Sequence, residues 1–147
     1  MEMKRGDSVG QGTAAFVNIL RAMDSALEQA LAKAKQVYLT TWSAKGKSGT
    51  VPVWFMVKEG VLYLTTLRDS LKARRIKATG RVRVQVGSRD GPSFEGRAEW
   101  VEDHPLEEEI VRVYRRKYPI LAGLFMGPLI RRRLARRESV LIKITPA

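Results

Sequence analysis

One short segment brings together the residue types that hold a phosphate group. Residues 65–75 read TTLRDSLKARR and follow a short apolar stretch that predicts a strand. The segment then opens a predicted helix, whose first N–H groups are unpaired and whose dipole is positive at this end. Asp69 is the predicted N-cap, and Ser70, Lys72 and Arg75 are within reach of an anion bound there. The alternative is a capped surface helix with a solvated basic face.

Alternating apolar residues before and after this segment predict the strands that must position it. The six predicted strands are 37–43, 50–57, 61–66, 81–86, 94–101 and 140–145. Glycine-containing turns join the first three, which therefore form a predicted meander. Short connections make the pairing antiparallel. Such a sheet closes most simply into a small barrel, with the last strand returning to an edge.

Apolar residues spaced by three and four predict the helices. The predicted helices are 13–35, 70–78 and 105–118. Gly80 ends the second helix, because glycine readily takes the left-handed conformation of a helix C-cap. We expect one domain over 1–147, with a loose tail over 1–12 and a helical insertion over 104–137 before the last strand.

Composition excludes several kinds of site. The chain has 147 residues, is 44% hydrophobic and 29% charged, and so has the size and balance of one globular domain. It has no cysteine, which excludes disulfides, thiolate metal sites and cysteine nucleophiles. The single histidine, His104, cannot build a His-rich metal site, and we expect no metal. We interpret His104 as a turn or cap residue, with a catalytic role as the alternative.

Charge and hydropathy indicate where the protein works and what it attracts. The net charge of +12 attracts polyanions: nucleic acid, anionic lipid, or a phosphorylated and carboxylated small molecule. No secretory signal is visible, and no apolar run is long enough to span a bilayer. We therefore expect a cytoplasmic protein.

Four motifs, in order along the chain, resemble those of one family. Residues 50–55 (TVPVWF) resemble the TPVWF strand of the split-barrel flavin-binding proteins related to pyridoxamine phosphate oxidase, and residues 69–76 resemble their Ser-x-Lys phosphate segment. Residues 80–84 and 95–98 resemble the two strands that follow in that family. The resemblance covers about residues 36–146. Within the superfamily the chain resembles the deazaflavin branch, the coenzyme F420-dependent oxidoreductases.

The resemblance implies both a fold and a site. The implied fold is mainly β with helices (α+β), a six-stranded antiparallel split β-barrel of the FMN-binding type, assembled as a homodimer with the cofactor between subunits. The residues implied to line the cofactor ring are Val51, Pro52, Val53 and Trp54. Those implied to hold its phosphate are Thr65, Thr66, Ser70, Lys72 and Arg75.

The resemblance also implies an enzyme, an F420-dependent oxidoreductase that transfers hydride between a deazaflavin, or a flavin, and a small conjugated organic acceptor. Coenzyme F420 is our first choice and FMN our second, because the polyanionic tail of F420 gives the charge of +12 a use that one phosphate does not. The cofactor carries the hydride chemistry, so few catalytic residues are needed. None is identified; Tyr38, Tyr63, Lys72 and solvent are candidate proton donors.

Three alternatives stay open. They are an FMN-binding oxidoreductase, a non-catalytic flavin or haem carrier, and a basic nucleic-acid-binding module. Arg81, Arg83 and Arg97 are flanked by Val and Ala, and this lack of stacking residues argues against nucleic acid. The arginine run 131–137 would bind the cofactor tail or form a solvated helix face. Peripheral membrane contact through residues 120–137 is the remaining interpretation.

Overall fold

The computed structural model describes residues 25–121 and 125–147. Contacts divide the chain into two units, Met1–Lys33 and Ala34–Ala147. In the first unit residues 25–33 are helical, in agreement with the end of the helix predicted over 13–35. The predicted tail and the beginning of that helix lie outside the described residues.

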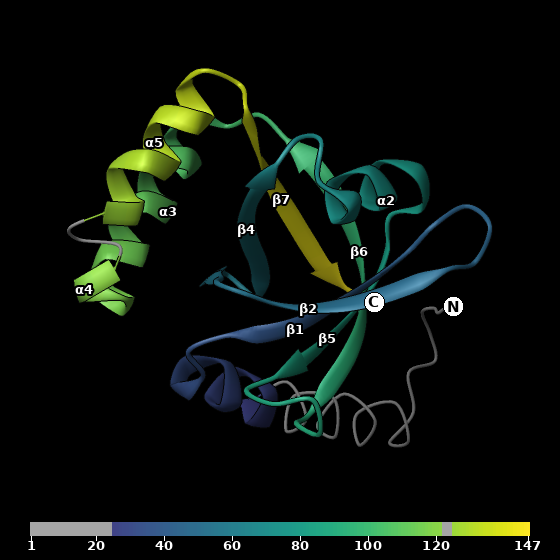
Figure 1. Cartoon of the computed structure of the whole chain (residues 1–147). Coiled ribbons are helices and arrows are strands. Elements are labelled where there is room, and N and C mark those ends of the chain that lie inside the picture. The colour runs from purple at the N-terminus through teal and green to yellow at the C-terminus, as the bar shows by residue number, and fades with distance from the viewer. Residues whose placement is uncertain (1–24, 122–124) are drawn as a thin grey trace, which may run out of the picture. The chain divides into compact units, whose positions relative to one another are not determined.

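The second unit is built on one antiparallel sheet that curls into a half-barrel (Figure 1). Its seven strands are β1 (Val37–Trp42), β2 (Ser48–Val53), β3 (Met56–Lys58), β4 (Val61–Leu67), β5 (Arg81–Val86), β6 (Ser93–Val101) and β7 (Ser139–Pro146). Their order across the sheet is β2-β1-β5-β6-β7-β4-β3. The predicted α+β split-barrel fold is confirmed.

The extra strand arises because the chain bends within the second predicted strand. β2 ends at Val53, the chain turns at Trp54 and Phe55, and β3 begins at Met56. β2 pairs with β1 at one edge of the sheet, whereas β3 pairs with β4 at the other. The first three predicted strands therefore do not form one meander. The buried side chain of Phe55, which has no exposed surface, fixes the turn in the core.

The last strand lies inside the sheet. β7 pairs with β4 on one side and with β6 on the other, so the prediction of an edge position is wrong. Four of its apolar residues are buried, namely Val140, Leu141, Ile142 and Ile144. A strand covered on both faces requires such a continuous apolar run.

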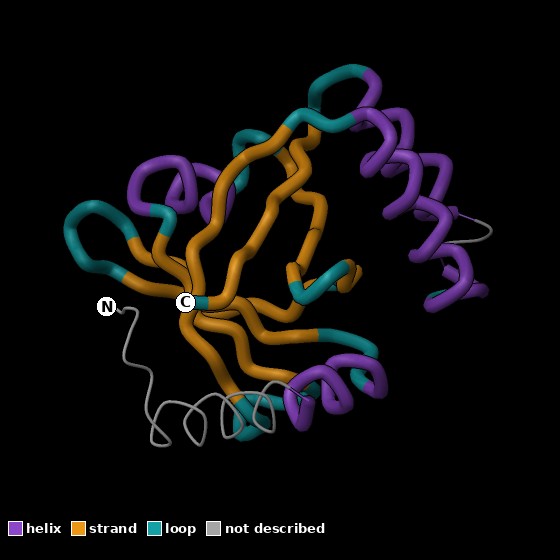
Figure 2. Tube along the Cα trace, turned by 180° about the vertical axis from the view of Figure 1, so that it is seen from behind, coloured by secondary structure: helices purple, strands orange, loops and turns teal. Residues whose placement is uncertain are grey.

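Four helices of the second unit cover two sides of this sheet (Figure 2). They are α2 (Leu71–Thr79), α3 (His104–Lys117), α4 (Pro119–Leu121) and α5 (Gly127–Ala135). α2 packs on β1, β4 and β6, whereas α3 and α5 pack on each other, with α5 also on β7. None of the helices in the described part of the chain is long and apolar enough to cross a bilayer.

The sheet therefore separates two cores. Val37, Leu39, Leu64, Val84 and Ile142 are among the buried residues that fill the half-barrel. A second cluster lies between the helices and the sheet, and it includes Tyr63, Ile110, Tyr114, Ile130 and Leu134. Side chains alternate along a strand, so neighbouring residues of β4 belong to different cores.

The N-cap of α2 is one residue later than predicted. Ser70 has an extended backbone, with φ −67° and ψ 156°, and its hydroxyl accepts a hydrogen bond from the Ala73 N–H at 3.2 Å. Ser70 is therefore the cap, and the prediction of Asp69 is wrong. Both residue types are good caps, and the sequence places them side by side. Gly80 ends the helix as predicted, with φ 69° and its N–H bonded to the Ile76 carbonyl.

Replacing the cap tests this assignment. We expect Ser70→Ala to lower the free energy of unfolding by about 1 kcal/mol, because it removes the acceptor for the Ala73 N–H. The neighbouring change Asp69→Ala removes no cap bond and is expected to cost less than about 0.5 kcal/mol. Urea unfolding of both variants measures the difference. Equal costs, or a larger cost for Asp69, would contradict the assignment.

A pair of glycine variants tests the helix end. Gly46 and Gly80 both have positive φ, 88° and 69°, but only an added Cβ at Gly80 would meet a neighbour, the Ala98 carbonyl oxygen at 3.1 Å. The left-handed conformation costs an alanine about 1–2 kcal/mol at either site. Gly80→Ala should therefore destabilise the protein more than Gly46→Ala in thermal or denaturant unfolding. A larger loss for Gly46→Ala would show that the Ala98 contact does not matter.

Candidate functional site

The first turn of α2 gathers hydroxyl groups and backbone donors at one point. The hydroxyl oxygens of Thr66 and Ser70 lie 3.0 Å apart. Ser70 accepts the Ala73 N–H, while the N–H groups of Leu71 and Lys72, at the first two helical positions, lie outside the intrahelical ladder. No acidic residue occupies this turn. The geometry suits an anion, because free N–H groups and the positive end of the helix dipole point the same way.

Lys72 adds a partly desolvated charge to this turn. Its side chain is half-buried, and burial lowers the pKa of Lys72 from its usual value. Among the residues that the structure describes, no carboxylate forms an ion pair with it. Burial without a counter-charge disfavours the charged ammonium, and an anion bound nearby would restore it.

Arg75 connects α2 with the edge strand β2. A Cβ added to Gly49 of β2 would lie 2.8 Å from Arg75 Nη1, so the absence of a side chain there lets the guanidinium approach the strand. The Nε of Arg75 is buried and, within the described residues, has no hydrogen-bond partner. A buried donor of this kind is costly unless it is satisfied. The guanidinium of Arg75 is suited to a phosphate, because it can donate two parallel hydrogen bonds.

The edge strand itself presents apolar surface. Val51 is 41% exposed and Pro52 is exposed as well. Alternation along the strand places Val51 and Val53 on the face of Gly49, next to Arg75, and Pro52 on the other face. Beside the helix start, Leu67 and Leu71 are also exposed. Cations and an apolar edge therefore meet at one place, as a cofactor with a flat ring and a phosphate requires.

Two of the predicted residues point elsewhere. Thr65 is next to Thr66 in β4 but faces the helical core, where it lies beside the Tyr114 hydroxyl. Trp54 stacks on Tyr118, with ring centroids 4.1 Å apart and an interplanar angle of 7°, and it meets Tyr114 edge-on. The structure thus brings Thr66, Ser70 and Lys72 together at the start of α2 and brings Arg75 to β2, whereas the side chains of Thr65 and Trp54 point elsewhere. Contact with a ligand stays a prediction for all nine residues.

Sequence reasoning overlooked Gly49. A glycine inside a strand often marks a close approach of another group, and this signal was present in the motif Ser48-Gly49-Thr50. It also overlooked the residues around Tyr118, which follow a basic helix end and lead into exposed apolar residues.

The face of the sheet that carries Arg81, Arg83 and Arg97 also carries an aromatic residue, Trp42. The guanidinium carbons of Arg81 and Arg83 lie 4.0 and 5.7 Å from the centroid of the Trp42 ring. Trp42 belongs to β1, which pairs with β5, so the flanking residues of β5 did not reveal it. Arg81 also lies directly opposite Arg97 of β6. The premise that this face lacks aromatic residues is wrong.

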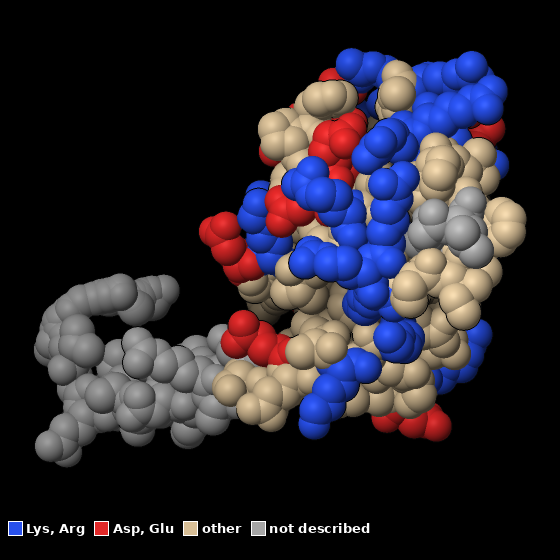
Figure 3. Space-filling model, turned by 90° about the vertical axis from the view of Figure 1, so that its left-hand side faces the viewer, with Lys and Arg blue, Asp and Glu red and all other residues tan. Residues whose placement is uncertain are grey.

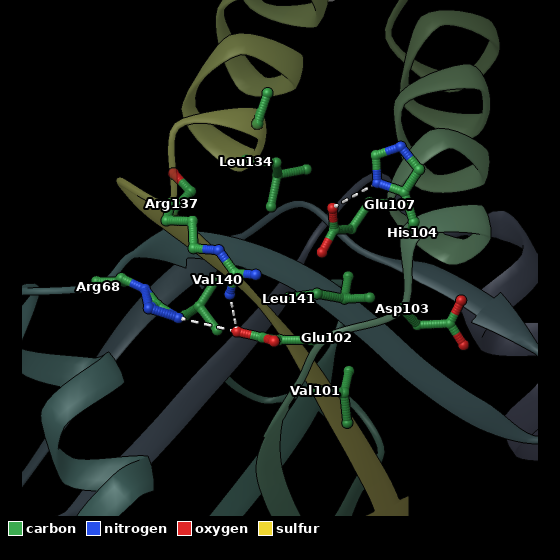
Figure 4. Close-up of a pocket in the computed structure, with 12 residues that line it drawn as sticks. Arg68, Val101, Glu102, Asp103, His104, Glu107, Leu134, Arg137, Val140 and Leu141 are labelled. Atoms are coloured by element: carbon green, nitrogen blue, oxygen red, sulfur yellow. Dashed lines mark hydrogen bonds and ion pairs between the residues drawn. The ribbon is translucent and has the colours of Figure 1, made fainter.

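A separate pocket of about 380 Å³ lies between the α5 end, the α3 start and the strands β6 and β7 (Figure 4). Arg68 and Arg137 both pair with Glu102 there, Arg68 at 3.7 Å. Glu102 already provides a counter-charge for these arginines, whereas Lys72 at the start of α2 has none among the described residues. The start of α2 is therefore the better candidate for an anion site.

His104 lies at the rim of this pocket, in the first turn of α3. Its Nδ1 is 3.7 Å from Glu107, and its side chain is largely exposed. Asp103, rather than His104, caps the helix, since its carboxylate accepts the Leu106 N–H at 3.1 Å.

Comparison with known proteins places this geometry in a family. The family model described as pyridoxamine 5'-phosphate oxidase matches residues 23–147. An F420 reductase structure is 25% identical, with a TM-score of 0.59, over 82% of this chain and 92% of its own. General Stress Protein 26 of Bacillus anthracis is 23% identical, with a TM-score of 0.62, over 84% of this chain and 88% of its own.

The heme storage protein HutZ of Vibrio cholerae is 13% identical, with a TM-score of 0.64, over 84% of this chain and 89% of its own. At these identities the stress protein and HutZ show a shared fold only. No curated protein sequence matches the chain. The family match over nearly the whole chain, together with the split-barrel sheet, shows that the chain belongs to the pyridoxamine 5'-phosphate oxidase family.

Proposed function

We propose that this protein is an oxidoreductase that uses coenzyme F420 to transfer hydride to or from a small conjugated organic molecule. One observation carries the proposal: Arg75, in the middle of α2, reaches Gly49 of the exposed edge strand. A cation of the helix and an apolar edge thereby meet. A phosphorylated cofactor with a flat ring needs both.

The residues present fit such a cofactor. Ser70, Lys72 and Arg75 would hold its phosphate, since Arg75 Nε lacks a partner among the described residues and Lys72 is partly desolvated. Val51 and Val53 would pack against its ring on the Arg75 side of β2. A bound deazaflavin supplies the hydride chemistry, and the protein supplies position and electrostatics.

The positions of the candidate proton donors differ in whether they face the apolar edge. Tyr63 is buried in the helical core, so it does not face the apolar edge. The Tyr38 hydroxyl accepts a hydrogen bond from Gln36 Nε2 at 3.2 Å, which leaves its own proton available for donation. Tyr38, however, lies opposite Pro52 in the pairing of β1 with β2, and therefore on the other face of the sheet from Val51 and Val53. We therefore favour Lys72 or solvent as the donor.

The position of the arginine run favours F420 over FMN. The run 131–137 ends beside the start of α2, because Ser139 pairs with Leu67 and the Arg68 N–H donates to the Glu138 carbonyl at 2.9 Å. Arg132 and Arg136 are exposed along α5 and just after it, and neither pairs with a carboxylate among the described residues. A polyanionic tail that leaves the phosphate site would meet these cations, whereas FMN ends at its phosphate.

The proposal includes a homodimer with the cofactor between subunits. Val51, Leu67 and Leu71 expose apolar surface around the helix start, and a second subunit would cover it. The candidate that competes most directly is a flavin or haem carrier, because it would use the same binding residues.

Titration of the purified protein with F420, FMN and haem distinguishes these candidates. We expect the tightest binding for F420, followed by absorbance changes of the reduced cofactor when an enone or quinone is added. Tight FMN binding without F420 binding would overturn the choice of cofactor. Tight F420 binding without turnover of any acceptor would favour the carrier.

The variant Lys72→Ala tests the phosphate site directly. We expect its affinity for the phosphorylated cofactor to fall by about 1.5–3 kcal/mol, as for a charge-assisted hydrogen bond. Lys77→Ala, on the same helix but exposed at its last turn, is the matched control and should bind as the parent does. An unchanged affinity for Lys72→Ala in isothermal titration would remove Lys72 from the site.

A further inference from the structure

An apolar pocket of about 450 Å³ lies where the bend after β2 meets the end of α3. It is lined by Lys35, Gln36, Trp54, Lys117, Tyr118, Pro119, Ile120 and Leu121. Its volume is in the range of small-molecule sites. Of the residues predicted to bind the cofactor, only Trp54 reaches it, so the pocket is distinct from the start of α2.

Flat rings and open aliphatic side chains form the apolar part of the pocket. Trp54 and Tyr118 stack within 4.1 Å, and Tyr114 meets both rings edge-on, which holds them in place. Ile120 is 73% exposed and Leu121 56%. A flat apolar ligand placed beside these rings would bury the exposed apolar surface of Ile120 and Leu121, which the hydrophobic effect favours.

Two lysines give the pocket a positive charge. Lys117 Nζ lies 3.2 Å above the centroid of the Phe55 ring and donates to the Phe55 carbonyl at 3.3 Å. Lys35 Nζ donates to the Lys117 carbonyl at 3.3 Å. Neither lysine pairs with a carboxylate in the part of the chain that the structure describes. Burial, and then the charge of Lys35, lower the pKa of Lys117 to about 8.

We propose that this pocket binds a small molecule with a flat apolar body and one anionic group, and that Lys117 holds the anionic group. An anion would supply the counter-charge that both lysines lack, while the body would cover Trp54, Tyr118 and Ile120. The proposal does not depend on the cofactor, because no residue of the α2 start lines the pocket.

An anionic membrane is the occupant that this proposal rejects. Residues 110–137 contain no Asp or Glu, and a band of Lys and Arg runs over the helical face beside uncharged surface (Figure 3). Lys117, however, is half-buried over the Phe55 ring instead of projecting outward. A charge set back among aromatic rings suits the anionic group of a small ligand better than the headgroups of a flat lipid surface.

Two fluorescent probes with the same rings, one anionic and one neutral, distinguish the contribution of the anionic group to binding from that of the apolar body. 1-Anilinonaphthalene-8-sulfonate has a flat apolar body and one sulfonate, and N-phenyl-1-naphthylamine has the same rings without the charge. We expect Lys117→Gln to weaken binding of the sulfonate about tenfold and to change binding of the neutral probe less than about twofold. Equal effects on both probes, or none, would overturn the role of Lys117.

Two further variants locate the probe and do not depend on the folding of Lys117→Gln. Ile120 lines the pocket and Phe125 does not, yet both are highly exposed, at 73% and 67%. Ile120→Glu should weaken binding of the sulfonate probe at least about fivefold, because it places a carboxylate at the pocket mouth, and Phe125→Glu should leave binding unchanged. Equal losses in both variants would show binding to the outer surface, as for a membrane, and would overturn the proposal.

The pH dependence gives an independent readout. Affinity for the sulfonate probe should fall as the pH rises through about 8, where Lys117 loses its proton, and affinity for the neutral probe should stay constant. The titratable groups around Lys117 are Lys35, Tyr114 and Tyr118. Burial raises the pKa of Tyr118 to about 12 and that of Tyr114 further, so both stay neutral. A flat profile for the sulfonate in the parent protein would overturn the proposal.

Discussion

The fold depends on how the chain is held at the bend between β2 and β3. The carbonyls of Trp54 and Phe55 face away from the sheet ladder, and buried carbonyls require partners. Helix α3 supplies both: the Tyr114 hydroxyl donates to Trp54 O at 3.1 Å and Lys117 Nζ donates to Phe55 O at 3.3 Å. These two bonds let one continuous segment form both edges of the sheet, so the position of the edge strand beside α2 follows from contacts made to α3.

The two faces of β4 separate the two proposed sites. Thr66 faces the half-barrel and meets Ser70, whereas Thr65 faces the helical core and lies beside Tyr114. The proposed anion site at α2 and the aromatic pocket at α3 therefore lie on opposite sides of the sheet. The bend after β2 touches both, because Val51 precedes it on the α2 side and Trp54 belongs to it on the α3 side.

Local patterns predicted much of this, and long-range contacts account for the rest. The strands 81–86 and 94–101 and the end of α2 at Gly80 follow from alternation and from glycine, which neighbouring residues determine. The bend at Trp54 depends on Tyr114, sixty positions later, and the central place of β7 depends on pairing with both β4 and β6. Asp69 and Ser70 are equally suitable N-caps, so the sequence alone does not determine which of them caps α2. The opposite directions of Thr65 and Thr66 follow from the alternation of side chains along β4, which places neighbouring residues on different faces.

The arginines of the outer face have a consequence for the conditions in which the fold persists. Arg81 and Arg97 face each other directly across β5 and β6, whereas Arg83, two residues along β5, pairs with Glu95 opposite it at 2.7 Å. Like charges opposite each other repel, and a net charge of +12 adds to this repulsion over the whole chain. Dissolved ions screen the interaction of exposed charges that lie more than about 10 Å apart at 0.1 M ionic strength. Added salt therefore weakens the repulsion that the charge of +12 spreads over the chain, and it also weakens exposed ion pairs such as that of Arg83 with Glu95.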